Sequence, residues 1–326
     1  MRLFSSLLIM LVLLLGALAA YSGYAWRHPS VAVEQVVVVA PGTGRLGILK
    51  QLYAAQVLPT PWKILLPLAT DTRLQRLKAG EYDFTAGLTP AQVLDMLARG
   101  AIVIHKVTVP EGYTVAQVRA VLMREPLLAG ELPTTIAEGS LFPDTWLFQR
   151  GDTRASLVMK MQERMGRELA AAWAGRDDGL VLTSPAQALT LASIVEAETG
   201  LPNERPLVAR VYLNRLQTGM LLQSDPTVAY GLAPGGLGRM LAHNDLLKDT
   251  AYNTYMHAGL PPGPVCNPGR AALHAAVHPA ESDALYFVAT GNGGHWFAAT
   301  IQEHEANVAA YRKVEAARAV GQPAAK

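Results

Sequence analysis

The most apolar stretch of the chain lies close to its start. Leu3 to Ala25 is a run of 23 positions without a charged side chain, and Trp26, Arg27 and His28 follow it. Because a helix rises about 1.5 Å per residue, roughly 20 residues cross the ~30 Å hydrocarbon core of a bilayer. The pattern predicts a retained transmembrane anchor. A cleaved signal peptide, with Ala17-Leu18-Ala19 as its cleavage site, is the alternative, and either would export the rest of the chain.

After this stretch, short segments with the hydrophobic periodicity of strands and helices predict a small α+β unit over residues 31–105. β-Branched residues followed by Pro41-Gly42 indicate a strand entering a turn. Thr89-Pro90 supplies an N-cap and a first-turn proline for a helix that stops at Gly100. The predicted order is strand, helix, strand and helix, at Val31–Ala40, Leu46–Ala55, Lys78–Phe84 and Pro90 to Gly100.

A larger α+β region follows over residues 106–315. It opens with a strand at Ile102–Val109 and closes with a strand at Ala284–Ala289 and a helix at Gln302–Ala317. His295, after the glycine-rich run Gly291–Gly294, is predicted at a hairpin tip. The predicted division is a membrane anchor at 1–30 (span about 3–25), a small module at 31–105, the larger domain at 106–315 and a tail at 316–326. The fold class is therefore α+β with an N-terminal transmembrane helix.

Composition removes several classes of partner and ligand. The formal charge is +2 and no long Lys/Arg-rich run is present, which excludes a nucleic-acid-binding stripe. Cys266 is the single cysteine, so neither an intramolecular disulfide nor a thiolate metal cluster can form. His274 and His278 have the i, i+4 spacing of metal ligands, but the glutamate of a zinc-protease motif is missing between them. We therefore predict neither a metal nor a cofactor.

The helix predicted from Pro185 to Thr199 carries the candidate chemistry. Its apolar positions cover more than half of its circumference, and Glu196 and Glu198 lie in its last turn. Residues two apart point to different flanks, so the two carboxylates are not expected to act across one substrate. A carboxylate there faces the negative end of the helix dipole and loses water, and both effects favour the protonated form of a general acid. The alternative is a pair of solvated helix-end residues bound to Arg205 or Arg210.

Polar and aromatic residues crowd the segments that follow this helix. A groove for an uncharged polymer such as a sugar chain uses amides, carboxylates and hydroxyls to bond hydroxyl groups, and flat aromatic rings to cover ring faces. Each such residue is also an ordinary loop cap or core tyrosine, and only their clustering favours a groove. The candidate binding residues are Gln223, Asp225, Tyr252, Asn253 and Tyr255.

Short motifs run in order through the region from about 105 to 312. They are Thr108-Val-Pro-Glu-Gly112, Glu138-Gly-Ser-Leu-Phe-Pro-Asp-Thr145, Ala192-Ser-Ile-Val-Glu-Ala-Glu-Thr199, Asn214-Arg-Leu216, Leu222-Gln-Ser-Asp-Pro-Thr-Val228, Tyr252-Asn-Thr-Tyr255, Gly259-Leu-Pro-Pro-Gly263, Asn267-Pro-Gly269, His278-Pro279, Tyr286-Phe-Val288 and Gly294-His295. Together these motifs resemble the endolytic murein transglycosylase, or YceG-like, family.

The resemblance implies a single-pass inner-membrane protein with a periplasmic catalytic domain behind a LysM-like module, here residues 31–105. Family members cleave nascent glycan strands between N-acetylmuramic acid and N-acetylglucosamine and leave 1,6-anhydromuramyl ends, which terminates glycan elongation. The first glutamate of the Ser-Ile-Val-Glu string, here Glu196, would be the catalytic acid/base. The expected partners are glycan strands and the inner membrane, with peptidoglycan synthases as candidate protein partners.

A single acid/base is enough for this reaction, because the muramyl O6 hydroxyl attacks C1 and no water enters. Two alternatives remain at this point. One is a muramidase-type hydrolase that uses Glu196 with Glu198 or Asp225 and water. The other is a non-catalytic, membrane-tethered scaffold that binds peptidoglycan.

Overall fold

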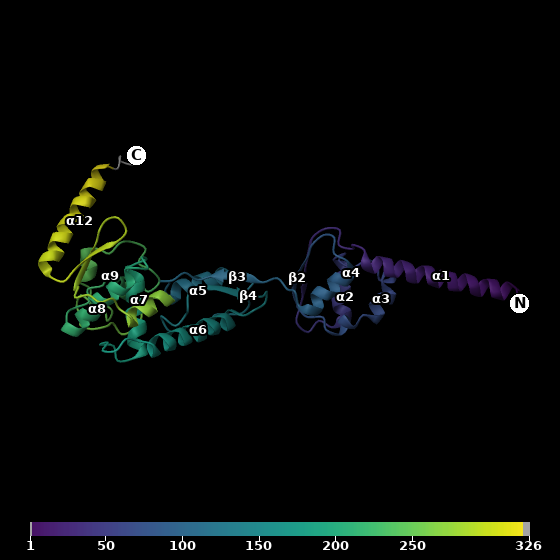
Figure 1. Cartoon of the computed structure of the whole chain (residues 1–326), viewed down its shortest axis with the longest axis horizontal. Coiled ribbons are helices and arrows are strands. Elements are labelled where there is room, and N and C mark those ends of the chain that lie inside the picture. Colours follow the sequence, from purple (N-terminus) through teal and green to yellow (C-terminus); the bar gives the residue numbers. More distant parts are fainter. Residues whose placement is uncertain (1, 322–326) are drawn as a thin grey trace. The chain divides into compact units, whose positions relative to one another are not determined.

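The computed structural model describes residues 2–321 (Figure 1). The chain divides into two compact units. The first comprises the chain up to Lys106 together with Leu147–Asp152, and the second comprises Val107–Trp146 together with the chain from Thr153 onward. Helices dominate both units and the sheets are small and two-stranded, which confirms the predicted α+β class.

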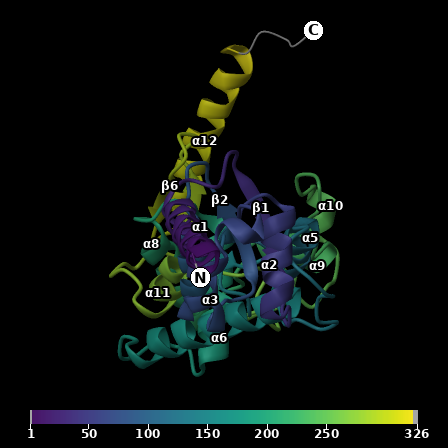
Figure 2. The same cartoon turned by 90° about the vertical axis from the view of Figure 1, so that its right-hand side faces the viewer.

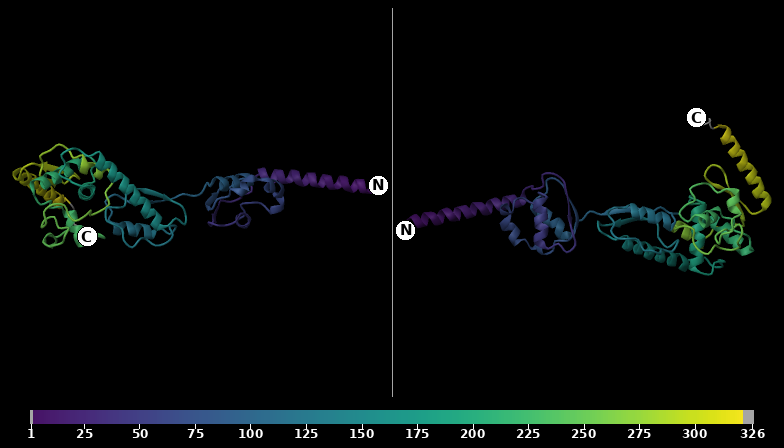
Figure 3. Two further views of the ribbon diagram at one scale, coloured as in Figure 1. Left: turned by 90° about the horizontal axis from the view of Figure 1, so that it is seen from below. Right: turned by 180° about the vertical axis from the view of Figure 1, so that it is seen from behind.

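The first unit begins with the long helix α1 (Arg2–Arg27), which projects from the unit as a single rod in Figures 1 and 3. Its segment Phe4–Arg27 is long and apolar enough to cross a membrane. Large apolar side chains from Phe4 to Leu15 are exposed along it. Such a surface is stable in lipid and costly in water, as both an anchor and a signal sequence require.

The predicted strand, helix, strand and helix are all present after α1. Strand β1 (Gln35–Val39) pairs antiparallel with β2 (Gly80–Phe84). The helices are α2 (Arg45–Ala54) and α4 (Pro90–Arg99), and α4 begins at a capping box between Thr89 and Gln92 and ends at Gly100, whose φ is +74°. Three short elements without a clear sequence period were not predicted: η1 (Pro61–Lys63), α3 (Leu65–Thr70) and η2 (Thr72–Gln75).

The second unit is built mainly from helices. Strand β3 (His105–Thr108) pairs with β4 (Thr145–Phe148), and β5 (Tyr286–Ala289) forms a hairpin with β6 (His295–Ala298). The helices are α5 (Val115–Arg124), α6 (Arg154–Ala174), α7 (Pro185–Glu198), α8 (Arg205–Thr218), α9 (Asp225–Leu232), α10 (His243–Leu246), α11 (Arg270–Val277) and α12 (Ile301–Gly321).

The C-terminal helix corrects one boundary of the sequence prediction. Positions 316–321, expected to begin a tail, continue α12, because an alanine-rich segment extends a helix readily. Helix α12 starts against β5 and β6 and then leads away from the rest of its unit in Figures 1 and 2. The remainder of the predicted tail, 322–326, lies outside the described residues.

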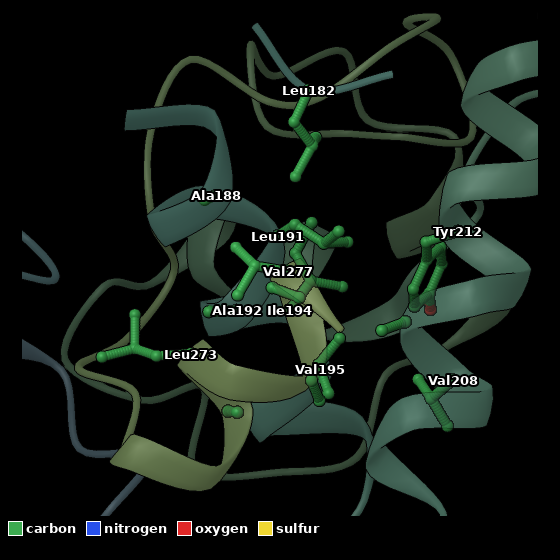
Figure 4. Close-up of a cluster of buried hydrophobic side chains, with 14 of the residues drawn as sticks. Leu182, Ala188, Leu191, Ala192, Ile194, Val195, Val208, Tyr212, Leu273 and Val277 are labelled. Carbon is green, nitrogen blue, oxygen red and sulfur yellow. The ribbon is translucent and has the colours of Figure 1, made fainter. Parts of the chain in front are cut away.

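Helix α7 lies at the centre of the second unit. It packs against α11, α8, α6 and α9, and Leu191, Ala192, Ile194 and Val195 are completely buried (Figure 4). Ser184 caps its first turn by accepting a hydrogen bond from the backbone N–H of Gln187. The prediction of a largely buried helix over this segment is confirmed, and its rigid core setting fixes the side chains of the last turn.

Candidate active site

The two glutamates in the last turn of α7, Glu196 and Glu198, lie in different surroundings. Glu196 lies in a closed ion cluster, where its side chain is 4% exposed. Arg205 Nη2 donates to its Oε1 at 3.0 Å, and the backbone N–H of Gly269 donates to its Oε2 at 2.9 Å. The Glu111 carboxylate is 3.8 Å from the same guanidinium. Both oxygens of Glu196 are therefore held by fixed protein donors.

Glu198 is held by hydroxyl groups and not by a cation. Its Oε1 accepts hydrogen bonds from Tyr212 Oη and from Ser224 Oγ, both at 2.6 Å. No residue in the described part of the chain donates to its Oε2. Burial raises the pKa of Glu198, and the hydrogen bonds from Ser224 and Tyr212 oppose that rise without cancelling it. The result is a carboxyl group with a raised pKa, the direction that a general acid requires, and with one oxygen free for a ligand.

Glu198 borders a cavity of about 230 Å³. The cavity is mixed in character, with two carboxylates, an amide, two tyrosines, a histidine, an arginine and apolar side chains around it. These come from α7, α8, the loop between α8 and α9, the start of α9, the segment after α10 and the β5–β6 hairpin. The lining residues are Glu198, Tyr212, Arg215, Leu222, Gln223, Asp225, Tyr255, Phe287, Val288, Ala289 and His295.

The loop that leads into α9 carries two of these residues and is tightly constrained. Gln223 has a φ of +51°, in the left-handed region that a non-glycine residue occupies at a cost of about 1 kcal/mol or more. Thr254 holds the loop, because its carbonyl accepts from the N–H of Gln223 at 3.0 Å and its hydroxyl accepts from the N–H of Ser224 at 2.9 Å. Backbone strain of this kind is concentrated at functional sites.

Tyr255 and Asp225 line the same cavity and are bonded to each other. Tyr255 Oη donates to Asp225 Oδ1 at 2.7 Å, and burial together with this carboxylate raises the pKa of the tyrosine well above its usual value. The tyrosine therefore stays a neutral hydrogen-bond donor and fixes the Asp225 carboxylate in one orientation. Asp225 also adds to the rise in the pKa of Glu198.

The five predicted binding residues separate into two groups. Gln223, Asp225 and Tyr255 line the cavity beside Glu198. Asn253 is 0% exposed and serves the loop itself, donating to the carbonyls of Leu246 at 2.9 Å and Lys248 at 2.8 Å. Tyr252 is not among the residues that line this cavity, and its ring lies 4.8 Å from that of Tyr230.

Several residues of the cavity wall were missed by sequence reasoning, and two of them, His295 and Arg215, carry polar groups held in fixed positions. His295, expected at a hairpin tip, begins β6 and lies on the cavity wall. Its Nδ1 is 2.7 Å from Glu204 Oε2, and its backbone N–H donates to Glu204 Oε1 at 2.8 Å. Although burial opposes ionisation, these bonds hold the pKa of Glu204 below its usual value. The ring of His295 is therefore fixed by a carboxylate, as in many catalytic dyads.

Arg215 is the second of these two residues, and it is a buried cation. Its Nε donates to the carbonyl of Leu285 at 2.7 Å, and its Nη1 donates to the carbonyl of Leu222 at 2.7 Å. These bonds connect α8 to the hairpin and to the loop before Gln223. The adjacent Asn214 donates to the carbonyls of Ser282 and Ala284, in the segment just before β5, so the Asn214-Arg215 pair was the sequence signal for this role.

Three comparisons with known proteins give the relatives of this chain. A profile of the YceG-like family matches residues 37–310. The endolytic murein transglycosylase of Bacillus subtilis (strain 168) is 31% identical over 258 residues, which are 70% of this chain and 71% of that protein. The protein of the same name from Streptococcus pneumoniae serotype 2 is 30% identical over 280 residues, and this chain spans about half of its length.

A solved structure supports the same relationship. The crystal structure of a yceG-like protein from Listeria monocytogenes is similar with a TM-score of 0.51 and 28% sequence identity, covering 84% of this chain and 99% of that one. The matched profile takes in α7, the cavity and most of both units. The chain belongs to the YceG-like family.

Proposed function

We propose that this chain is a peptidoglycan lytic transglycosylase, a lyase that cuts glycan strands internally, with Glu198 as its acid/base. One observation carries the assignment: in a member of this family, a glutamate with a raised pKa leaves one carboxyl oxygen open in a cavity that Gln223, Asp225 and Tyr255 also line. Amide, carboxylate and phenol groups are the partners that sugar hydroxyl and acetamido groups require.

The geometry favours Glu198 over Glu196, the residue suggested by the family motif. To donate a proton, Glu196 would have to leave both Arg205 and the backbone N–H of Gly269. Breaking a buried ion pair in this way costs several kcal/mol, about 3 to 5 in typical proteins. Glu198 needs no such rearrangement, because Oε2 is available while Tyr212 and Ser224 keep Oε1 in place.

The reaction then uses one carboxyl group twice. The protonated Glu198 gives its proton to the glycosidic oxygen as the bond from that oxygen to C1 of the muramyl residue breaks and positive charge develops on the sugar ring. The resulting carboxylate takes the proton of the muramyl O6 hydroxyl while O6 bonds to C1. The products are a free hydroxyl on the departing strand and a 1,6-anhydro ring, and Glu198 is protonated again.

Asp225 supports a second candidate reaction. It is a carboxylate in the same cavity, fixed by Tyr255, and could activate water against C1. The enzyme would then be a muramidase-type hydrolase with two carboxylates. The lyase is preferred because the relatives from Bacillus subtilis and Streptococcus pneumoniae are endolytic murein transglycosylases.

The N-terminal helix determines the proposed location of the protein. Helix α1 would remain as a single-pass anchor in the inner membrane, with residues 31–105 as a LysM-like module and the catalytic unit in the periplasm. The length and apolar surface of α1 support the anchor. We further propose that cleavage ends the elongation of nascent strands, in the neighbourhood of peptidoglycan synthases.

Mass analysis of products from purified glycan strands tests these proposals together. The lyase releases anhydro ends, which are lighter by one water than the reducing ends that a hydrolase releases. Glu198→Gln should abolish either product, while Glu196→Gln should leave the product type unchanged and cleavage within about tenfold of wild type. Reducing ends would establish the hydrolase. A fast Glu198→Gln enzyme beside an inactive Glu196→Gln enzyme would return the acid/base role to Glu196.

A further inference from the structure

The end of α1 is packed against the first unit. Helix α1 contacts η1, α3 and α4, and Ser22 on α1 is buried. The ring of Tyr21 stacks on the ring of Trp62 in η1, with centroids 5.8 Å apart and planes 16° apart. Because α1 is a rigid rod, this contact fixes the position of η1 and α3 along the axis of the helix.

The length of α1 places that contact at a membrane boundary. The candidate span begins at Phe4, and about 20 residues cross the hydrocarbon core, so the core would end near Gly23. Tyr21, Tyr24 and Trp26 then lie at the boundary, where tyrosine and tryptophan are enriched in membrane proteins. Trp62 lies beside Tyr21 and is therefore at the same depth.

The segment from η1 to α3 has two different sides. Ile64 and Leu68 are buried in the core of the unit. On the other side Trp62 is 54% exposed, Leu65 is 57% exposed and Leu66 is 48% exposed. We call Trp62, Lys63, Leu65 and Leu66 the interfacial foot. The Lys63 ammonium group lies 5.8 Å from the centroid of the Trp62 ring, so the foot joins a cation to three large apolar side chains.

We propose that the interfacial foot rests in the lipid surface beside α1. Trp62, Leu65 and Leu66 would enter the boundary between headgroups and acyl chains, and Lys63 would remain level with the lipid phosphates. An apolar side with an adjacent cation and an aromatic ring is the composition of helices that lie in this boundary. The proposal rests on the retained anchor of the proposed function and is independent of the catalytic assignment.

The foot would change how the first unit is held. Because the end of α1 is packed on the first unit, the helix and the unit can tilt only together in the bilayer. A second contact with the lipid at the foot, offset from the axis of α1, would limit that tilt. The chain would then leave the membrane-bound unit at a fixed height above the lipid.

Spin labelling of the full chain in lipid nanodiscs tests the foot directly. The single native cysteine, Cys266, is buried and is first replaced in a Cys266→Ala background that retains cleavage. Single labels are then placed by Leu65→Cys and Leu66→Cys. Matched labels are Leu11→Cys, midway along α1, and Val36→Cys, on β1 in the same unit, where Val36 is 57% exposed. Collision of each label with oxygen and with a water-soluble nickel complex reports its surroundings.

At positions 65 and 66 we expect a ratio of oxygen to nickel collisions at least severalfold higher than at position 36, and lower than at position 11. If 65 and 66 match 36 while 11 lies in lipid, the foot is refuted and the anchor stands. If 11 also lies in water, the anchor fails and the foot fails with it. Labels at 65 and 66 that are shielded from both collision partners would indicate a protein contact and would equally overturn the proposal.

Discussion

The two sides of the last turn of α7 place the same side chain in opposite settings. On one side, Glu196 has both oxygens bound, one to a guanidinium and one to a backbone amide. On the other, Glu198 has one oxygen bound to two hydroxyls and the other open to a cavity. A cation and an amide hold a carboxylate in place, whereas burial beside neutral hydroxyls lets a proton come and go. The partners of a glutamate, more than its place in a motif, therefore indicate its role.

The largest effect is expected from Glu198→Gln. General acid–base catalysis contributes about 10²- to 10⁴-fold, so the rate of strand cleavage should fall by at least 100-fold. The amide oxygen of glutamine still accepts from Tyr212 and Ser224, so the melting temperature should remain close to that of wild type. Release of anhydro ends measures the first effect and circular dichroism the second. A variant that keeps a tenth of the wild-type rate would remove Glu198 from the mechanism.

Next in size is the loss of the cation on the Glu196 side. Arg205→Met leaves the Glu196 carboxylate buried without its partner, and the free energy of unfolding should fall by about 3 kcal/mol. The matched control is Arg270→Met. Arg270 is 65% exposed in its ion pair with Glu168, so its loss should cost less than about 1 kcal/mol. Urea unfolding measures both. Equal stability losses in the two variants would contradict a structural role for the Glu196 cluster.

Much of the frame around these glutamates was predictable from the sequence. The Ser184-Pro185 start and the Gly200 stop give α7 within one residue, and helical spacing already separates Glu196 from Glu198. Which of the two borders a cavity was not predictable. That choice depends on Tyr212, Ser224 and the β5–β6 hairpin, which reach Glu198 only through tertiary packing.

The candidate binding residues show the same limit. Asn253 and Gln223 both carry amide side chains in loops, and such side chains are typical of sugar-binding sites. Asn253 is buried inside its own loop, whereas Gln223 lines the cavity. His295 followed a run of glycines that indicated only a turn, and its role depends on Glu204, which lies 91 positions earlier. Local patterns report turns and helices, and they do not report which side of a turn faces a cavity.

A smaller effect is expected from the substitution of His295, which lines the same cavity as Glu198. His295 is fixed by Glu204 on the cavity wall, and its loss should remove one hydrogen bond of about 1.5 kcal/mol from the bound state. His295→Ala should therefore lower kcat/KM about tenfold. His257→Ala is the control, since His257 is half exposed beside Asp249 and outside the cavity lining. If both substitutions had the same effect, His295 would have no special part in the site.

The smallest expected effect is on the pH dependence of stability, which distinguishes Glu198 from Glu196 in measurements without substrate. The pKa of Glu198 is raised in the folded state by burial, so the folded protein binds its proton more tightly than the unfolded chain does. The stability that this contributes is fully present below the unfolded pKa of about 4.3 and is lost as the pH rises through the raised value. Glu204, whose pKa is lowered, contributes with the opposite sign, and its share is common to wild type and Glu198→Gln.

Subtracting the two unfolding curves therefore isolates Glu198. The difference in unfolding free energy between Glu198→Gln and wild type should grow as the pH rises from acid through neutral, in favour of the variant. Cleavage by the wild type should fall over the same upper range, because the proton donor is lost there. A difference that stays flat with pH would mean that Glu198 titrates as in the unfolded chain, and the contrast with Glu196 would then rest on hydrogen-bond geometry alone.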